Sequence, residues 1–394
     1  ACRCRRSRRS RNQAKPSSWW TATPHTPIET TVPSAQEIHR CQFFVGPKSD
    51  TGEVFVVGGQ HAMSSGSHHY LVYRTKLSSI PPDLQGQNDC TEHGGVMRYA
   101  LSYVGGGQTP FENADFPAGV GLPIRSGEVL LVQGHFLNTG DAPKRESIRV
   151  LFRTAATPAA IENRAGVLQF YDPFIVVPGR ASASATMRCP IRRDVTLLSA
   201  GPHMHKHGVS YAAFVDPPGS TSRDPFYTSS DWSHPTFWLG YRPVQAGSHV
   251  RFRCDYRNDD AQTVTQGSSA ETNEMCMFGA YYYPAMDPED ELCAKMDSHG
   301  TGDATCAQTT SCLEKCPVAE APKFAQGSWD VGPCWQQCIT RSCPNVTEAL
   351  FPQLTCTQDK CAAECASMGD ACRNCVVAKC AREVAACQSL ACDR

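Results

Sequence analysis

Three groups of histidines lie in or beside stretches of sequence that look like β-strands. The groups are His68 and His69 in GSHHYLVYR, His135 in LLVQGHFLN, and His203, His205 and His207 in GPHMHKHGVSY. Imidazole is the commonest metal ligand in proteins, so such groups indicate a candidate metal site. Because alternate residues of a strand point to the same face, His203 and His205 are placed to bind one ion.

His68 and His69 need an irregular backbone if they are to act together. Adjacent residues point to opposite faces of a regular strand, so the pair could share an ion only at a strand end, a bulge or a turn. The segment Ser64–Ser67, with Gly66, would supply such an irregularity. Either histidine pair alone is more often two partly exposed loop residues, and it is the combination of spacings that favours a metal site.

A framework of β-strands is predicted to position these histidines. Short runs rich in β-branched and aromatic residues alternate with turn clusters, as in antiparallel sheets. The runs are 53–59, 68–74, 128–136 and 147–153, followed by 166–177, 195–201, 209–215, 249–256 and 275–283. The pattern restarts near residue 161, which predicts an all-β fold of two tandem antiparallel sandwiches, at residues 36–157 and 158–300.

Composition and charge exclude several classes of function. The 394 residues carry a net charge of −1, so the chain as a whole has no attraction to nucleic acid or to an anionic membrane. No apolar run reaches the roughly 18 residues of a membrane span. Residues 1–35 are basic and then rich in Pro, Ser and Thr, which predicts disorder. Residues 1–15 carry six Arg and one Lys with no apolar segment after them, so they are not a secretion signal as they stand.

Cysteine is concentrated at the end of the sequence, where fourteen of the 22 cysteines lie between 306 and 392. TCAQTTSCLEKC (305–316) resembles TCTQDKCAAEC (355–365), CWQQCITRSC (334–343) resembles CRNCVVAKC (372–380), and CQSLAC (387–392) begins a third copy. Spacings of three and four residues place thiols on one face of a helix. We therefore expect residues 301–394 to form disulfide-linked helical hairpins, with an unknown partner, in an exported protein. Zinc is the weaker alternative, because only His299 lies nearby.

Longer motifs give the sequence a family resemblance. The His68–His69 pair is followed by FPAGVGLPIRSGEVLLVQGHF, then by DPFIVVPG, Cys189 and the His203-x-His205 pair, and finally by NEMCMFGAYYYP. Over residues 38–297 these landmarks and their order resemble the type II, ascorbate-dependent copper monooxygenases. That family includes peptidylglycine α-hydroxylating monooxygenase and dopamine β-monooxygenase. The resemblance implies jelly-roll-like sandwiches and two separate copper sites.

The resemblance also implies a role for each candidate residue. One copper, which stores an electron, would be bound by His68, His69 and His135. The other, where oxygen reacts with a substrate C–H bond, would be bound by His203, His205 and Met275. Ascorbate would reduce both coppers, and the distant first site would supply the second electron. Gln133 matches a glutamine linked to positioning and electron passage, although it could equally be an ordinary strand residue, and His207 is expected at the surface or beside the ligands.

The ligand types support copper over zinc. A thioether such as that of Met275 is a soft ligand that favours Cu(I), and imidazole binds both oxidation states of copper. Zinc does not change its redox state, so it could not support this chemistry. The resemblance further implies the disulfides Cys254–Cys276 and Cys189–Cys293, and Cys41 and Cys90 are left to pair in the first sandwich.

Two positions depart from the family pattern. Gly201 stands where the peptide-amidating enzymes carry a carboxylate-binding arginine, and Gly279 stands where they carry a tyrosine. Both changes predict a roomier or less polar pocket and make a glycine-extended peptide a doubtful substrate. We expect a secreted or periplasmic enzyme that hydroxylates a small organic molecule. The alternatives are a non-catalytic extracellular copper-binding protein and an adhesion protein whose working part is the Cys-rich region.

Overall fold

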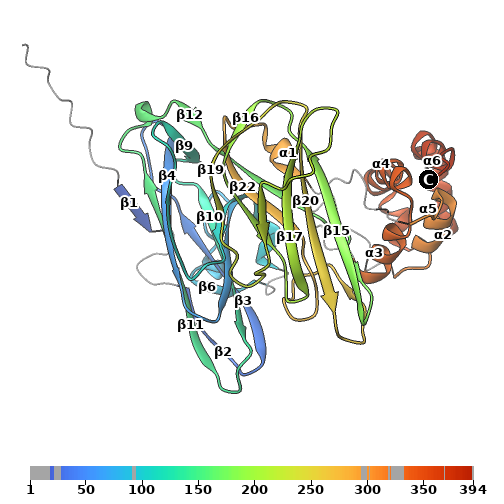
Figure 1. The fold of residues 1–394 in the computed structure, drawn as a ribbon, viewed down its shortest axis with the longest axis horizontal. Coiled ribbons are helices and arrows are strands. Elements are labelled where there is room, and N and C mark those ends of the chain that lie inside the picture. The colour runs from blue at the N-terminus through green and yellow to red at the C-terminus, as the bar shows by residue number, and fades with distance from the viewer. Residues whose placement is uncertain are drawn as a thin grey trace, which may run out of the picture.

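The computed structural model describes residues 18–21, 28–90, 95–293, 300, 302–317, 320, 332–367 and 369–392. The basic residues 1–17 and His299 lie outside the described residues. The described chain is mostly β, with a helical region at its end (Figure 1). No described helix is long and apolar enough to cross a membrane.

The first sandwich is built from two sheets. One has the order β1 (Ser18–Thr21), β11 (Lys144–Thr154), β4 (Glu53–Met63), β9 (Val120–Arg125) and β12 (Asn163–Arg164), with β2 (Ile28–Val32) paired to β11 and β8 (Phe111–Asp115) paired to β4. The other has the order β6 (Gln87–Asp89), β3 (Gln36–Val45), β10 (Val129–Asn138), β5 (Ser67–Thr75) and β7 (Ala100–Gly107). Three short 3₁₀ turns accompany this part of the chain, at Pro82–Leu84, Val96–Tyr99 and Pro158–Ala160.

Apolar side chains from both sheets meet between them. Val56 and Val150 from the first sheet pack in one cluster with Val72 and Leu130 from the second. The outer face of the second sheet is covered by a smaller cluster, which contains the disulfide Cys41–Cys90. The pairing of these two cysteines is thus confirmed, and the sheet that carries His135 is packed on both faces.

The sandwich begins earlier than the sequence predicts. The composition of residues 1–35 predicts disorder, but β2 pairs with β11, and its Ile28 and Val32 are fully buried. The partner strand comes much later in the chain. Nothing local in a segment rich in Pro and Thr therefore marks it as a strand.

The second sandwich repeats the design. One sheet has the order β19 (Trp238–Val244), β16 (Val195–His203), β22 (Met277–Tyr283), β13 (Gly166–Tyr171) and β23 (Leu292–Cys293), the last following the short helix α1 (Pro288–Glu291). The other has the order β15 (Ala181–Pro190), β20 (His249–Asn258), β17 (Gly208–Asp216) and β18 (Tyr227–Ser229). A two-stranded sheet joins β14 (Val176–Val177) to β21 (Val264–Thr265).

Aromatic rings fill the core of the second sandwich. Phe278 of β22 lies 6.1 Å from Phe252 of β20, measured between ring centroids, and Tyr211 of β17 joins the same cluster. The disulfides Cys189–Cys293 and Cys254–Cys276 are both present, as the family resemblance implied. The second of these ties β20 to the residue just before β22.

The two sandwiches share apolar contacts. Val167 and Leu198 of the second sandwich belong to the core cluster of the first, and Tyr281 packs against that cluster. The Tyr281 hydroxyl donates to the carbonyl of Val104 at 3.3 Å. A Cβ at Gly105 would overlap this hydroxyl, so the glycine run at the end of β7 permits the close approach.

The Cys-rich region consists of helices joined by disulfides. Its elements are α2 (Cys306–Leu313), α3 (Pro333–Thr340), α4 (Pro344–Cys361), a 3₁₀ turn at Glu364–Ala366, α5 (Asp370–Lys379) and α6 (Ala381–Gln388). Cys312–Cys338 and Cys316–Cys334 link α2 and the residues after it to α3, and Cys356–Cys380, Cys361–Cys375 and Cys365–Cys372 link the α4–α5 hairpin. The predicted hairpins are therefore confirmed.

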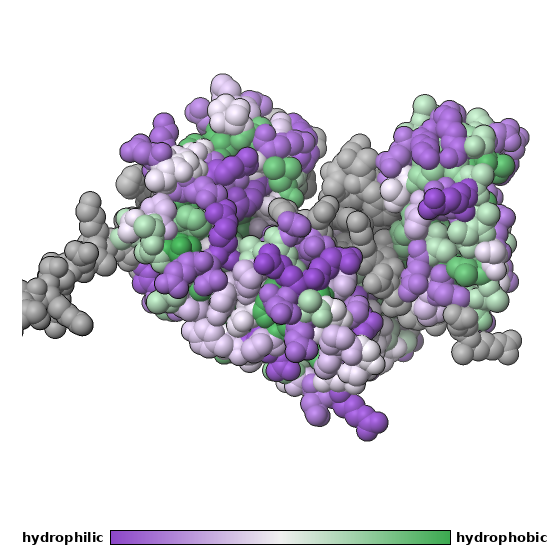
Figure 2. All heavy atoms as spheres, turned by 90° about the horizontal axis from the view of Figure 1, so that it is seen from above, coloured by the Kyte–Doolittle hydropathy of each residue, from purple (hydrophilic) through white to green (hydrophobic). Residues whose placement is uncertain are grey.

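The third partial copy completes the first hairpin. The second hairpin is closed by its own disulfide, Cys356–Cys380. The equivalent cysteines of the first hairpin, Cys306 and Cys343, do not pair with each other. They pair with Cys387 and Cys392 of the last copy, respectively. All fourteen cysteines of the region are then in disulfides, which leaves no thiolate among them for the zinc alternative. Figure 2 shows that the helical region projects from one side of the β body, and that hydrophobic residues on the visible face are scattered among hydrophilic ones.

Candidate metal centre

His68 and His69 lie at the start of β5, where the strand is irregular. In the pairing of β5 with β10, His69 is opposite His135, but the next pair joins Ser67 to Phe136. His68 is therefore the extra residue of a β-bulge, which turns adjacent side chains away from their regular alternation. Both histidines are buried, with ring centroids 5.0 Å apart. The structure confirms the irregular backbone that the sequence required.

Histidines from three neighbouring strands form a row across this sheet. His135 of β10 is directly opposite His69 of β5 on one side and His39 of β3 on the other. The rings of His39 and His135 stack with centroids 4.0 Å apart. His135 Nδ1 lies 3.3 Å from His69 Nε2. No motif in the sequence points to His39. Gln133 contacts this row at His39, where the Nε2 atom of Gln133 lies 3.4 Å from the Nδ1 atom of His39.

His203 and His205 are presented by the end of β16 and the turn that follows it. His203 is the last residue of β16, and the amide of Gly208 closes the turn by donating to the carbonyl of His205 at 2.9 Å. The buried carboxylate of Glu274 accepts hydrogen bonds from the backbone amides of His205 (3.0 Å) and His207 (2.7 Å). The His207 ring also contacts this carboxylate, at 3.0 Å, so His207 is buried beside the other histidines rather than at the surface.

The two predicted ligand groups meet in one cluster between the sandwiches. The ring of His68 lies 5.2 Å from that of His135, 5.4 Å from that of His203 and 6.0 Å from that of His205. His68, His203 and His205 have ligand atoms within 4.8 Å of one another, and so do His68, His69 and His135. The resemblance implies distant sites, whereas here the two groups share His68 and form a continuous set of five imidazoles.

Gln108 fixes His203 from the first sandwich. Its Nε2 donates to the carbonyls of Trp232 (2.6 Å) and Ser233 (3.3 Å). Its Oε1 is therefore the acceptor for His203 Nδ1, at 2.9 Å. His203 thus carries its proton on Nδ1, which leaves the Nε2 lone pair free. Gln108 is not among the residues predicted from the sequence, although the glycine run before it, Gly105–Gly107, marks a place of close backbone approach.

Glu37 fixes His135 in the same way and also reaches the second sandwich. Its Oε2 lies 3.1 Å from His135 Nε2 and accepts from the backbone amide of Ala270 at 3.0 Å. Burial raises the pKa of Glu37, but hydrogen bonds from His135, Ser269 and Ala270 outweigh it and lower the pKa to about 2. The carboxylate is therefore ionised and accepts a hydrogen bond from His135 Nε2. No local sequence signal marks Glu37.

Burial keeps most of the cluster uncharged. The pKa values of His68, His69 and His203 lie well below the usual range, because burial and the neighbouring imidazoles disfavour the charged ring. The same causes lower the pKa of His205 to about 4 and that of His39 to about 3. Neutral imidazole is the form that binds a metal, so the protein presents ligands without first having to remove protons.

Several ring nitrogens of the cluster have no protein partner. Among the described residues, the buried atoms His68 Nε2, His69 Nδ1 and His205 Nε2 make no hydrogen bond. On His205 the other nitrogen, Nδ1, lies 3.1 Å from the carbonyl of Asn273, so the proton is on Nδ1 and Nε2 holds the lone pair. Buried polar atoms of this kind are normally paired. A set of imidazole nitrogens, with carboxylates only behind the rings, suits a first-row transition metal, copper among them.

Met275 lies beside the His203–His205 turn. It is half-buried and sits between Glu274, which bonds the backbone of that turn, and Cys276, which is in the disulfide to β20. Its carbonyl accepts from the Tyr256 hydroxyl at 2.9 Å. In the pairing of β16 with β22, Met277 is opposite His203. By strand alternation Met275 would share that face, just beyond the end of the pairing.

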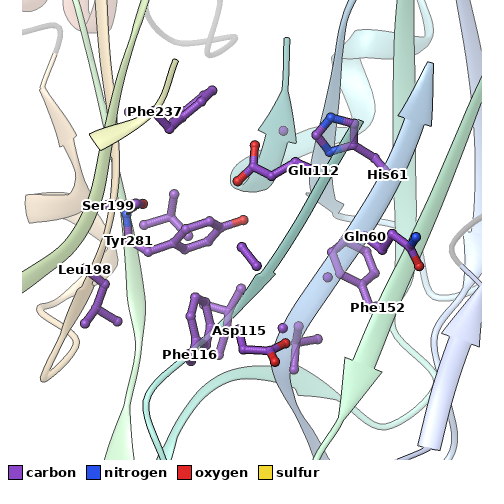
Figure 3. Close-up of a pocket in the computed structure, with 18 of the residues that line it drawn as sticks. Gln60, His61, Glu112, Asp115, Phe116, Phe152, Leu198, Ser199, Phe237 and Tyr281 are labelled. Atoms are coloured by element: carbon purple, nitrogen blue, oxygen red, sulfur yellow. Dashed lines mark hydrogen bonds between the residues drawn. The ribbon is translucent and has the colours of Figure 1, made fainter. Parts of the chain in front are cut away.

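A pocket lies between the two sandwiches, on the same face of β16 and β22 as His203. Its volume is about 120 Å³, and Ser199, Gly279 and Tyr281 line it from the second sandwich. Figure 3 shows Tyr281 and Phe237 facing His61, Glu112 and Phe152 of the first sandwich. None of the described residues that line the pocket is Lys or Arg.

Of the two glycines that depart from the family pattern, Gly279 lines this pocket. Gly201 and Gly279 are opposite each other in the β16–β22 pairing. A Cβ at Gly201 would overlap the ring of Phe237, whereas a Cβ at Gly279 would have only the carbonyl of Gly201 nearby, at 4.0 Å. The aromatic ring of Phe237 therefore packs where an arginine would start, and Gly279 opens onto the cavity.

Comparisons with known proteins support one half of this assembly directly. Residues 163–304 match the family model for the C-terminal domain of copper type II ascorbate-dependent monooxygenases. No curated protein matches the chain.

Solved structures add little. VP54 of PBCV-1, fitted into a reconstruction of the virophage Sputnik, is 8% identical, with 68% of this chain and 94% of that chain covered and a TM-score of 0.18. Infectious bursal disease virus, Gx strain, is 7% identical, with coverages of 69% and 72% and a TM-score of 0.14. Scores this low give no support to either a fold or a function.

The matched segment carries the His203–His205 turn, Met275 and both disulfides of the second sandwich. Its family also agrees with the chemistry of the ligand set. Residues 163–304 of the chain are therefore similar to the C-terminal domain of the copper type II ascorbate-dependent monooxygenases.

Proposed function

We propose that this protein is a copper-dependent monooxygenase that hydroxylates a C–H bond of an organic substrate with O₂ and an ascorbate-type reductant. The observation that carries the proposal is the cluster of five imidazoles, four of them buried, contributed by both sandwiches and including three ring nitrogens without a protein partner. The disulfides of both sandwiches and of the Cys-rich region suit an oxidising compartment, so we also propose that the protein acts outside the cytosol.

Two copper ions per chain are proposed. His68, His69 and His135 would hold one, and His203, His205 and Met275 would hold the other. Copper, when bound, supplies one-electron redox chemistry and reactivity toward O₂. The thioether of Met275 is the soft ligand of the set, which favours the reduced ion.

The residues around the ligands fix which ring nitrogen is available. Glu37 holds the Nε2 proton of His135, Gln108 holds the Nδ1 proton of His203, and the carbonyl of Asn273 holds that of His205. Such outer hydrogen bonds orient imidazole rings and raise their basicity as ligands. Because Glu37 and Gln108 each contact the other sandwich as well, they also hold the two ligand groups together.

The pocket would receive the substrate, since Gly279 in its wall is opposite Gly201, two residues before His203 on β16. Its walls include the rings of Phe237, Phe116 and Tyr281, the last two in edge contact with centroids 5.0 Å apart. The described residues that line it include no Lys or Arg to pair with a substrate carboxylate, and they include the carboxylates of Glu112 and Asp115. A small, largely apolar molecule fits it better than a glycine-extended peptide, because burial of apolar area would supply the binding energy.

The decisive experiment replaces Met275 with isoleucine in the full chain. A shape-similar apolar residue preserves packing at a cost below about 1.5 kcal/mol, so the fold should remain. If Met275 is a ligand, X-ray absorption of the reduced, copper-loaded protein should lose its copper–sulfur signal. Reductant-dependent oxygen consumption should then collapse, while the copper held by His68, His69 and His135 remains.

Met277→Ile is the matched control, since it makes the same replacement two residues away on the same face. It should keep both the sulfur signal and the oxygen consumption. Wild-type turnover in Met275→Ile with no sulfur signal in the parent would refute the assignment. Copper binding without substrate-dependent oxygen consumption in the parent would favour the non-catalytic copper-binding alternative.

A further inference from the structure

The Cys-rich region contacts the second sandwich through a buried amide. Gln336 of α3 is completely buried. Its Oε1 accepts from the backbone amides of Gln266 (2.8 Å) and Ile175 (3.3 Å), and its Nε2 donates to the carbonyl of Gln266 at 2.9 Å. Phe174, next to Ile175, packs into the apolar cluster of the helices, with its ring 5.6 Å from that of Phe351.

These bonds join two strands where their pairing ends. β14 and β21 pair over only two residues each, Val176 with Thr265 and Val177 with Val264. The Gln336 amide binds the residue just beyond this short ladder on each strand, Ile175 before β14 and Gln266 after β21. The Gln266 amide also donates to the Ile175 carbonyl at 3.2 Å, so Gln336 reinforces a direct contact between the two strands. The Ile175 amide and the Gln266 carbonyl bind Gln336 itself, and a buried backbone group left without a partner would cost about 1–3 kcal/mol. The helical region therefore fixes the point at which the chain leaves β21.

The segment that leaves β21 runs directly to the candidate metal centre. Gln266 forms a bridge with Glu274, whose amide donates to the carbonyl of Thr265 at 3.0 Å and whose carbonyl accepts from Gly267 at 3.2 Å. Glu274 is the fully buried carboxylate that binds the backbone amides of His205 and His207. Gln266 alone therefore stands between the Gln336 amide and the residue whose side chain shapes the histidine turn.

The same segment reaches both histidine groups. The carbonyl of Asn273 accepts from His205 Nδ1 at 3.1 Å. The amide of Ala270 binds the Glu37 carboxylate, which in turn holds His135. Residues 266–275 thus lie between the helical region on one side and the five imidazoles on the other. This one segment is sufficient to connect them.

We propose that the Cys-rich region is a positioning element of the metal centre, and that Gln336 acts through Gln266 and Glu274 to hold the His203–His205 turn in its ligand geometry. This inference rests on the proposed function, because that function supplies the metal. The contacts of Gln336 are observed independently of it. Gln336 is a positioning residue, since it touches neither ligands nor substrate. Seven disulfides make the helical region rigid enough to serve as a fixed support for a short irregular segment.

The test compares Gln336→Leu with Gln353→Leu in the full chain. Gln353 is a buried glutamine of α4 in the same region, so its replacement controls for the general cost of a leucine there. In metal-free protein, hydrogen exchange of the 266–275 amides should become faster in Gln336→Leu and stay at the wild-type rate in Gln353→Leu. After copper loading, affinity at the Met275 site should fall on the order of tenfold or more in Gln336→Leu alone, as for other residues behind metal ligands.

A milder variant guards against misfolding. Gln336→Asn keeps an amide but shortens it by one methylene, so it should show the same changes in smaller measure. Wild-type exchange at 266–275 in a folded Gln336→Leu protein, or equal losses in Gln353→Leu, would overturn the inference. Faster exchange in Gln336→Leu, together with no copper binding by any variant, would support the positioning contact and refute the proposed function instead.

Discussion

Glu37 is a single residue that touches both halves of the histidine cluster. One carboxylate oxygen accepts from His135 of its own sandwich and from the amide of Ala270 of the other. A charged acceptor makes a stronger hydrogen bond than a neutral one and increases the basicity of the ring it holds. The residue therefore acts on the ligand group of His135 and on the contact between the sandwiches together.

Replacing Glu37 with glutamine should accordingly weaken copper binding by about 10- to 100-fold at the His135 site, because the ring loses its charged partner. Titration against a competing chelator would measure this. Glu271→Gln is the matched control, since Glu271 is next to Ala270 but pairs with Lys206 instead. Unchanged affinity in Glu37→Gln, or an equal loss in the control, would show that the carboxylate does not support the ligand.

Single residues also show how far the sequence carries a prediction. The bulge at His68 could be expected, because two adjacent histidines require it if they are to share an ion. Glu37, His39 and Gln108 could not be expected. Each is an ordinary strand or loop residue by type, and only the packing of separate strands and sandwiches brings it to the cluster.

At the scale of the element, three strands of the second sandwich are tied by one buried carboxylate. Asp216, at the end of β17, is fully buried. It pairs with Arg251 of β20 at 2.9 Å and Arg188 of β15 at 3.4 Å. Burial raises the pKa of Asp216, but hydrogen bonds from Arg251, Ser222 and Arg188 outweigh it, so the pKa lies below its usual value.

The pKa of Asp216 is lower in the folded protein than in the unfolded chain. The ionised carboxylate therefore contributes its full stabilisation at pH values above the pKa of the unfolded chain, and loses it as the pH falls through the pKa of the folded protein. Asp216→Asn should lower the free energy of unfolding at neutral pH by about 3 kcal/mol, the usual cost of breaking a buried pair. Denaturant unfolding would measure it. The difference should shrink in strong acid. Asp255→Asn, which breaks the exposed pair with Arg253, should cost less than about 1 kcal/mol. Equal costs would contradict this account.

Strands could be predicted where apolar and polar residues alternate and β-branched residues are frequent. Examples are residues 53–59, which lie in β4, and residues 128–136, which lie almost entirely in β10. The short strand β2 was not, because its burial comes from a distant partner, β11. The hairpins of the Cys-rich region followed from cysteine spacing alone. The pairing of Cys306 and Cys343 with the third copy did not, since spacing fixes a helix face but not which neighbouring helix it meets.

At the scale of the whole molecule, the pocket between the sandwiches is lined by residues of both, so neither sandwich would form it alone. Gly279 opens onto it from the second sandwich. The volume is about 120 Å³, so a side chain placed there would compete directly with a bound molecule.

Gly279→Leu should therefore reduce turnover and binding of a bulky apolar substrate by at least about tenfold, through steric exclusion, while leaving the copper content unchanged. Substrate-dependent oxygen consumption and metal analysis would test both parts. Gly219 is a turn glycine where an added Cβ would meet nothing within 4 Å. Gly219→Asn serves as the surface control, because asparagine tolerates the positive φ of this position. Full turnover in Gly279→Leu would place the substrate elsewhere.

The way the last cysteines complete the first hairpin bears on how the protein is made. By analogy with Cys356–Cys380, the natural local partner of Cys306 is Cys343, yet both are joined to Cys387 and Cys392. During synthesis Cys306 and Cys343 emerge well before those partners. A chain that oxidises as it emerges therefore meets the wrong thiol first, and must later exchange it. We expect correct assembly to depend on an isomerase during export, and recombinant production in a host compartment that lacks one to give mispaired chains.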